Sequence, residues 1–529
     1  MSGATTASSV ERYASALGTI ARQPIVLLIV TTTLLRLAIA AATGLGVDES
    51  YMVGNARSFS WSYVDHPPLH VWIAAAMMRI FGSESAIVVR VPFILLFAAS
   101  TWFMFTLTRQ IFGRQAGFWA ALTFNLAPIF AVGHGIYVLP DGPLIFFLLA
   151  SANILVSILF DHRERQRTLS WITAGAAAGL ALLSKYSAVF FIASVFAYLL
   201  TEPGARRWLR TPGPWLAALV SAVLFAPAFA WNVEHNLAGF SFQAGRVAPS
   251  QENPLRLIGE SFGGQAGYLT PWLLVSLAVA LLGALTRGPR DRKAWFLALL
   301  AVGPVAFFAL LSFRAKVLPH WPMPGWLFVF PLFGEVAASG AAARPLLFKG
   351  LAACWAAALL LIATGATLQA AGLGIRQETV RGLGLADPTI DLLDWSGLRE
   401  AFASRGLLTA SLVVGAPDWI TAGKASYALG PSIPVLCLCG DPHHFRFRAD
   451  PANFVGRDII LVGRGQGVDD GLAQYFNSVQ PMPPISVERR GEPVLTLAVA
   501  VGHNLHAIKQ SAEREGLPRE LTALAAPLY

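Results

Sequence analysis

The chain has 529 residues, of which 55% are hydrophobic and only 13% are charged. Soluble globular proteins carry roughly 25% charged residues, so this composition excludes an ordinary soluble protein. The net charge of +9 does not indicate a nucleic-acid-binding surface, because the basic residues gather in short loops between apolar runs.

Apolar runs close to the roughly 20 residues that cross a bilayer recur through the first two thirds of the chain. The first run has no small-residue cleavage site after it, so we expect an uncleaved signal-anchor helix. The runs predict eleven membrane-spanning helices, within a range of 11 to 13, at 24–44, 87–108, 116–134, 142–160, 169–184, 187–201, 213–232, 268–286, 294–313, 322–340 and 346–368.

The composition changes after the last of these runs, where short alternating apolar stretches, dispersed charge and many Gly and Pro residues follow. We therefore predict a cytoplasmic segment 1–23, an all-α membrane domain 24–369 and a soluble α/β domain 370–529. In that last domain, strands are expected at 407–414, 434–438, 459–462 and 494–501. Cys437 and Cys439 are too close in sequence for an easy disulfide.

Charge in the loops predicts the orientation of the chain. One set of alternate loops holds sixteen Lys and Arg residues and the other set holds eight, and cytoplasmic loops carry the excess of positive charge. We therefore expect an inner-membrane protein of a bacterium, with loop 45–86 and the C-terminal domain in the periplasm. The apolar stretch Leu69–Phe81 is too short to span and is expected to lie in the membrane interface.

Ionisable residues near the membrane fall on this same outer side. Such residues are costly at a bilayer and are functional candidates by default. They come from four separate loops and predict an extracytoplasmic active site. They are Asp48, Glu49, Tyr63, Asp65, His66, His134, Asp141, Lys185, Arg314, Lys316 and His320.

This set of side chains suits transfer of a group from a lipid-phosphate carrier. A carboxylate serves as general base on an acceptor hydroxyl, and cations stabilise the charge on a departing phosphate. Nucleotide sugars are normally absent outside the cytoplasm, and the sequence has neither a Walker loop nor a Gly-x-Gly-x-x-Gly after a strand. A donor there is expected to be lipid-linked.

The order of these motifs resembles the polyprenyl-phosphate-dependent glycosyltransferases of the GT-C membrane fold. The similarity is to bacterial protein O-mannosyltransferase-like enzymes and lipid A aminoarabinose transferase (glycosyltransferase families 39 and 83), which use carriers such as undecaprenyl phosphate. It covers most of the chain and includes Asp48-Glu49, the stretch from Tyr63 to Leu69, Asp141, Lys185 and the segment from Lys316 to Pro322.

The resemblance implies an inverting reaction with Asp48 as catalytic acid/base. It implies that Tyr63, His66, Lys185, Arg314, Lys316 and His320 bind the donor phosphate, and that Glu49, Asp65, His134 and Asp141 support them. Two residues depart from the aminoarabinose enzymes: Tyr51 stands in place of an Arg, and His66 in place of a Lys. Both changes remove positive charge and favour a hexose or uronic acid donor, with a glycolipid such as lipid A, a polysaccharide or a protein as acceptor.

Other interpretations of the same residues remain open at this point. Asp48 could cap a helix, and Lys185 could reach along an apolar helix end to water. Glu49, Asp65, His66 and His320 could together hold a divalent metal, the one cofactor that the sequence suggests. A polytopic lipid or sugar transporter (or flippase) is the alternative function, although no inverted repeat of the kind that many transporters have is apparent.

Overall fold

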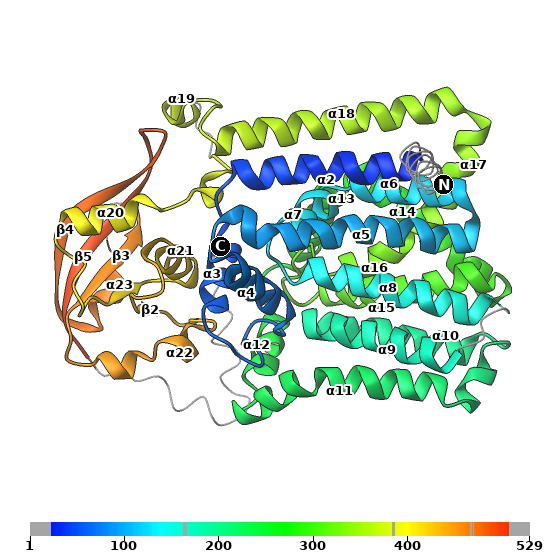
Figure 1. Ribbon diagram of the computed structural model, residues 1–529, viewed down its shortest axis with the longest axis horizontal. Helices are drawn as coiled ribbons and strands as arrows, with labels where there is room; N and C mark the ends of the chain where they lie inside the picture. Colours follow the sequence, from blue (N-terminus) through cyan, green and yellow to red (C-terminus); the bar gives the residue numbers. More distant parts are fainter. Residues whose placement is uncertain (1–22, 162–166, 383–386, 466–467, 469, 507–529) are drawn as a thin grey trace, which may run out of the picture.

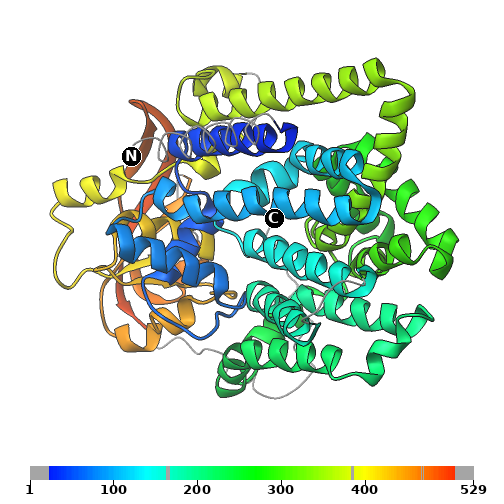
Figure 2. The same cartoon turned by 45° about the vertical axis from the view of Figure 1, so that its right-hand side comes forward.

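The computed structural model describes residues 23–161, 167–382, 387–465, 468 and 470–506. A bundle of roughly parallel helices forms one end of the molecule and a sheet domain forms the other, as both views show (Figures 1 and 2). In the described part, eight helices are long and apolar enough to cross a membrane: Pro24–Ala42 (α2), Ala86–Phe112 (α5), Asp141–Phe160 (α8), Gly213–Glu234 (α11), Pro271–Arg290 (α14 with η4), Arg292–Leu311 (α15), Met323–Ala343 (α16 to α17) and Pro345–Ala370 (α18).

Three further predicted spans coincide with less regular helices. Two are apolar but short, α9 (Arg167–Ser184) and α10 (Val189–Thr201). The third, predicted at 116–134, is broken into α6 (Arg114–Leu126) and a second part, Ile129–Ile136, which is bent by 78° against the first. Each of the eleven predicted runs is therefore helical, and the fold is the helical membrane bundle that the sequence predicts.

A buried arginine stabilises the broken helix. Arg36 on α2 donates from Nε to the carbonyl oxygen of Ala131 at 2.8 Å and from Nη2 to Oδ1 of Asn125 at 3.0 Å. A backbone carbonyl without a partner costs several kcal/mol at membrane depth, so Arg36 supplies the donor that the break in the helix requires. The hydropathy pattern gave no sign of this break.

Loop 45–86 contains two helices, α3 (Val47–Ala56) and α4 (Leu69–Phe81). The 13 residues of α4 are those of the apolar stretch that the sequence predicts. Both helices lie between the bundle and the sheet domain (Figure 1). Side chains of α3 and α4 share one hydrophobic cluster with residues of the C-terminal domain such as Trp395 and Phe402, so loop 45–86 is the packed junction of the two parts.

Two more helices, α12 (Ala238–Arg246) and α13 (Pro254–Leu269), follow α11. The C-terminal part contains a five-stranded sheet with strand order β2-β1-β3-β5-β4. Its elements are α19 (Gln377–Gly382), α20 (Gly397–Ser404), β1 (Val414–Ala416), α21 (Trp419–Leu429), β2 (Val435–Cys437), α22 (Phe445–Arg448), β3 (Ile459–Arg464), α23 (Asp470–Ala473), β4 (Phe476–Arg489) and β5 (Glu492–Leu505).

The sheet is mixed, because β1 pairs in parallel with β2 and β3 while β5 pairs antiparallel with β3 and β4. The strands predicted at 434–438, 459–462 and 494–501 are confirmed, but the run at 407–414 is strand only from Val414 onwards. The sequence also missed β4. Its prolines discourage a strand assignment, yet proline is tolerated on an edge strand, and β4 is at the sheet edge.

The expectation for the cysteines is wrong. Cys437 and Cys439 form a disulfide at the end of β2, with their Cα atoms 5.5 Å apart. This separation lies inside the range that a disulfide spans, so the extended backbone of a Cys-x-Cys segment brings the two thiols within reach. The bridge directly precedes the loop that leads to α22.

Candidate active site

Asp48 lies in the first turn of α3, which has Gly46 and not Asp48 as its N-cap residue. Its side chain is exposed to solvent, and it makes no hydrogen bond or ion pair with any residue that the structure describes. The pKa of Asp48 is raised to about 6, mainly by partial loss of hydration and to a smaller extent by repulsion from Asp65 and Glu49. An unpaired carboxyl group with a pKa near neutrality has the properties of a general base.

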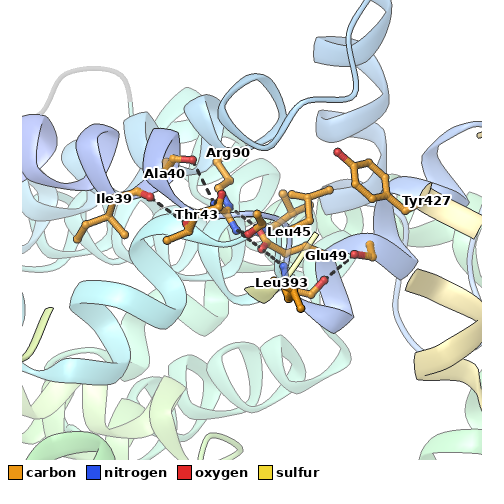
Figure 3. A network of polar contacts seen from close by, with 12 residues as sticks. Ile39, Ala40, Thr43, Leu45, Glu49, Arg90, Leu393 and Tyr427 are labelled. Atoms are coloured by element: carbon orange, nitrogen blue, oxygen red, sulfur yellow. Dashed lines mark hydrogen bonds and ion pairs between the residues drawn. The ribbon is translucent and has the colours of Figure 1, made fainter. Parts of the chain in front are cut away.

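Glu49, the next residue, points to the other side of α3 and is fully engaged. Its two carboxylate oxygens accept from Arg90, with Nε to Oε1 at 2.8 Å and Nη2 to Oε2 at 2.5 Å. They also accept from the backbone N–H groups of Gly46 and Val138 at 2.8 and 3.1 Å. Arg90 in turn donates to Thr43 and to the carbonyl of Ala40 (Figure 3). Glu49 therefore joins three segments of the fold, which argues against its predicted role in binding substrate or metal.

The predicted motif after α3 is folded back onto this helix. Asp65 is buried, and its Oδ1 accepts a hydrogen bond from the hydroxyl of Tyr51 at 3.2 Å. Tyr63 is buried as well, and its ring contacts that of His444 with 4.7 Å between centroids. Burial, with smaller repulsion from His70 and Lys185, lowers the pKa of His66 well below its ordinary value. His66 is therefore neutral at pH 7.

A second group of predicted residues meets where α8 begins and α9 ends. Lys185 Nζ donates to both carboxylate oxygens of Asp141, at 2.9 and 3.0 Å. His134 Nε2 lies 3.7 Å from Asp141 Oδ1. His320, from the segment between α15 and α16, interacts electrostatically with both Lys185 and Asp141, and burial lowers its pKa to about 3. Residues from three distant parts of the sequence thus form one polar cluster.

Arg314 and Lys316 are placed less centrally. The Arg314 side chain is exposed, and its backbone carbonyl accepts from the N–H of Ser250 at 2.8 Å. Lys316 is half-buried. Their donor-binding role remains a prediction from the sequence.

Arg246, at the end of α12, connects the two groups of ionisable residues. Its charge acts on Asp48 and Asp65 on one side and on His66 and His320 on the other. Its guanidinium carbon lies 5.3 Å from the ring centroid of Trp321. Arg246 belongs to no recognisable motif of its long loop, so its positive charge was the only feature of the sequence that indicated a role in the site.

The C-terminal domain contributes the remaining wall of the site, which the sequence did not predict. The backbone N–H of His444 donates to the Tyr51 hydroxyl at 2.9 Å. His443 stacks on Trp419 with 4.5 Å between ring centroids and has its Nδ1 3.3 Å from Oδ1 of Asp441. Both Asp48 and Asp65 feel the charge of His443.

The expected metal set is not assembled in the structure. Within the ranges that the structure describes, no three His, Cys, Asp or Glu side chains are arranged to hold a metal ion. Glu49 is paired with Arg90, while His320 belongs to the group around Asp141. The geometry therefore does not support the metal hypothesis.

Comparison with known proteins agrees with this architecture. Residues 65–231 match the sequence family described as dolichyl-phosphate-mannose-protein mannosyltransferase. The lipid A galacturonosyltransferase RgtD of Rhizobium johnstonii is 24% identical over 287 residues, covering 54% of this chain and 59% of that protein. The undecaprenyl phosphate-alpha-4-amino-4-deoxy-L-arabinose arabinosyl transferase of Pseudomonas aeruginosa is 28% identical over 290 residues, which cover 52% of this chain and 50% of that protein. The chain thus spans little more than half the length of these relatives.

The fold is also that of a solved membrane protein, ArnT. The apo structure of ArnT from Cupriavidus metallidurans superposes with a TM-score of 0.59 over 92% of this chain and 98% of that one, at 16% identity. The structure of the same protein bound to undecaprenyl phosphate gives 0.58 over 90% and 97%, at 15% identity. The chain therefore has the fold of ArnT, and over about half of its length it is similar in sequence to membrane glycosyltransferases that are named for lipid A galacturonosyl transfer and for arabinosyl transfer from undecaprenyl phosphate.

Proposed function

We propose that this protein is an inverting glycosyltransferase that moves a sugar from a polyprenyl-phosphate carrier to a glycolipid acceptor such as lipid A. The observation that carries the proposal is the unpaired Asp48 carboxyl group, which lies beside Asp65 and within the electrostatic influence of His443 and Arg246 in an ArnT-like fold. Its pKa of about 6 leaves most of the group ionised at pH 7, as a general base requires.

In the reaction, the acceptor hydroxyl oxygen attacks C1 of the sugar from the face opposite the phosphate. The new C1–O bond forms as the bond between C1 and the phosphate oxygen breaks, and polyprenyl phosphate leaves with the electron pair. Asp48 takes the hydroxyl proton. We assign stabilisation of the departing phosphate to Arg246, whose charge acts on Asp48, and to Lys185, which is paired with Asp141; a single displacement inverts C1.

We further propose a six-carbon donor sugar, a hexose or a uronic acid. One relative is named as a lipid A galacturonosyltransferase and another as an aminoarabinosyl transferase. Tyr51 supports the first kind, because its hydroxyl is taken up by Asp65 and His444 and it brings no positive charge where the aminoarabinose enzymes have Arg. Because the relatives are glycosyltransferases, the transporter alternative has no comparable support.

The proposed site faces the periplasm. Two observations support this orientation: the sixteen basic residues of the loops on the opposite side, and the Cys437–Cys439 disulfide, since disulfides persist in oxidising compartments. Under this proposal the donor enters laterally from the outer leaflet of the inner membrane.

The test is transfer of labelled sugar by the purified full-length protein. Synthetic polyprenyl-phosphate donors carrying galacturonic acid, glucose or 4-amino-4-deoxyarabinose are supplied with lipid A. We expect label in the lipid product from a six-carbon donor, and its loss in Asp48→Asn. Asp391→Asn, at an exposed carboxylate of the C-terminal part, is the matched control. Near wild-type turnover by a folded Asp48→Asn protein would exclude the proposed base, and transfer of the arabinose derivative alone would overturn the sugar class.

A further inference from the structure

His443 is held in a defined position at the boundary of the two parts of the molecule. Its backbone has a φ of 49°, a conformation that costs energy for a residue other than glycine. Its ring lies between Trp419, 4.5 Å away in a stacked arrangement, and Phe242, 5.0 Å away edge-on. Tyr51 contacts the same ring from α3 at 5.9 Å. Three elements thus enclose one imidazole.

The polar contacts of His443 orient its two nitrogens differently. Nδ1 faces Asp441, with 3.3 Å to both the side-chain Oδ1 and the backbone oxygen. Among the described residues, the polar contacts of the His443 side chain are all made at Nδ1 and none at Nε2. A carboxylate at Nδ1 fixes the orientation of an imidazole and favours its protonated form, so Asp441 favours the positive charge on His443.

The charge of His443 matters because acids dominate this side of the cavity. Asp65 and, more weakly, Glu49 repel the charge of Asp48, although Glu49 is itself paired with Arg90. Burial alone would lower the pKa of His443, but the hydrogen bond and charge of Asp441 and the charge of Asp65 raise it above its ordinary value. The titratable and charged groups around the imidazole are Asp441 and Arg446 on its own segment, Asp48 and Tyr51 on α3, Asp65 on the following loop, and Arg246 on α12.

We propose that His443 is a positioning residue of the reaction: held by Asp441 and Trp419, it presents a positive charge from the C-terminal domain to Asp48 and keeps this base ionised. The inference rests on the proposed function of Asp48. It assigns to the C-terminal domain a direct part in the chemistry, because without its loop at 440–448 the acids of α3 and of the following loop would have Arg246 as their main cation.

The predicted consequence is a shift of the pH profile. His443→Gln removes the cation and is expected to move the acidic limb of kcat/KM upward by about one pH unit, the lower end of the effect of a nearby opposite charge. Below the limb, kcat/KM then falls about tenfold, while the plateau at high pH is retained because Asp48 is ionised there in both proteins. A purely structural defect would lower kcat/KM equally at every pH.

The experiment measures kcat/KM of the full-length protein from pH 5 to pH 9 with the lipid-linked donor that the transfer assay identifies. His443→Lys keeps the charge and is expected to restore the wild-type limb. His503→Gln, at an exposed His–Asp pair on β5, is the matched control and is expected to behave as wild type. If His443→Gln does not fold, Asp441→Asn, which leaves the imidazole in place but weakens its protonation, is expected to shift the limb in the same direction.

An unchanged acidic limb in His443→Gln, or a His443→Lys protein that behaves like His443→Gln, would overturn the inference while leaving the transfer reaction intact. Full activity of Asp48→Asn would instead remove the proposed function on which it rests. The two failures are therefore distinguishable in one set of variants.

Discussion

Replacing Glu49 by Gln is expected to destabilise the folded protein without a specific effect on chemistry. The Glu49 carboxylate accepts four hydrogen bonds, two of them from Arg90, and the Arg90 side chain is 0% exposed. Gln retains one acceptor oxygen but no charge, so it leaves a buried guanidinium without its counter-ion. Breaking a buried ion pair by removing one partner costs about 3–5 kcal/mol, and we expect this loss in the free energy of unfolding.

The measurement is denaturant unfolding of the detergent-solubilised protein, followed by tryptophan fluorescence, beside the transfer assay. The double variant Glu49→Gln/Arg90→Leu removes both charges, so its destabilisation should be smaller than the sum of the two single losses. Asp48→Asn, one residue away, should lose activity at unchanged stability, because Asp48 has no partner among the described residues. A Glu49→Gln protein with wild-type stability and a strongly reduced kcat would refute the structural role assigned to Glu49.

Two further predictions concern buried lysines. Lys424 donates to the carbonyl of Leu393, and burial lowers its pKa to about 8. Between pH 8 and about 10.4, the folded protein therefore binds fewer protons than the unfolded chain. The free energy of unfolding should rise with pH across that window in wild type relative to Lys424→Met, and equal slopes in the two proteins would contradict it. Lys185→Gln should raise the KM for the lipid-linked donor about tenfold or more, because a hydrogen bond to a charged group is lost. Lys185→Arg, which keeps the charge, is the control. A lower unfolding midpoint at unchanged KM would instead show that the pair with Asp141 is purely structural.

Sequence patterns predicted the elements whose signal is local. Hydropathy located the helices, including those that are short or broken, because an apolar run can be recognised from its own residues alone. Asp48, Asp141 and Lys185 were found because ionisable residues are rare next to apolar runs. Two of them, Asp141 and Lys185, meet in the structure from positions 44 residues apart.

What the sequence could not provide arises from contacts between distant segments. Nothing near Glu49 indicates that Arg90 will neutralise it. His443 becomes part of the site only because its loop docks on Tyr51, and Arg246 only because α12 folds back across the outer face. The strand β4 was missed for a different reason: its prolines and its alternating exposure are those of an edge strand, which periodicity separates poorly from a loop.

The packing of α3 against α21 has a consequence for the order of events during synthesis. Arg57 Nη1 donates to the carbonyl of Ser426, 369 residues later in the chain, at 2.7 Å. At a translation rate of about 5–20 residues per second, the partner surface of α3 follows it by about 20–70 s. Asp48 is therefore synthesised early, but its surroundings are complete only after the last third of the chain has been made. An interrupted nascent chain carries the proposed base without a working site.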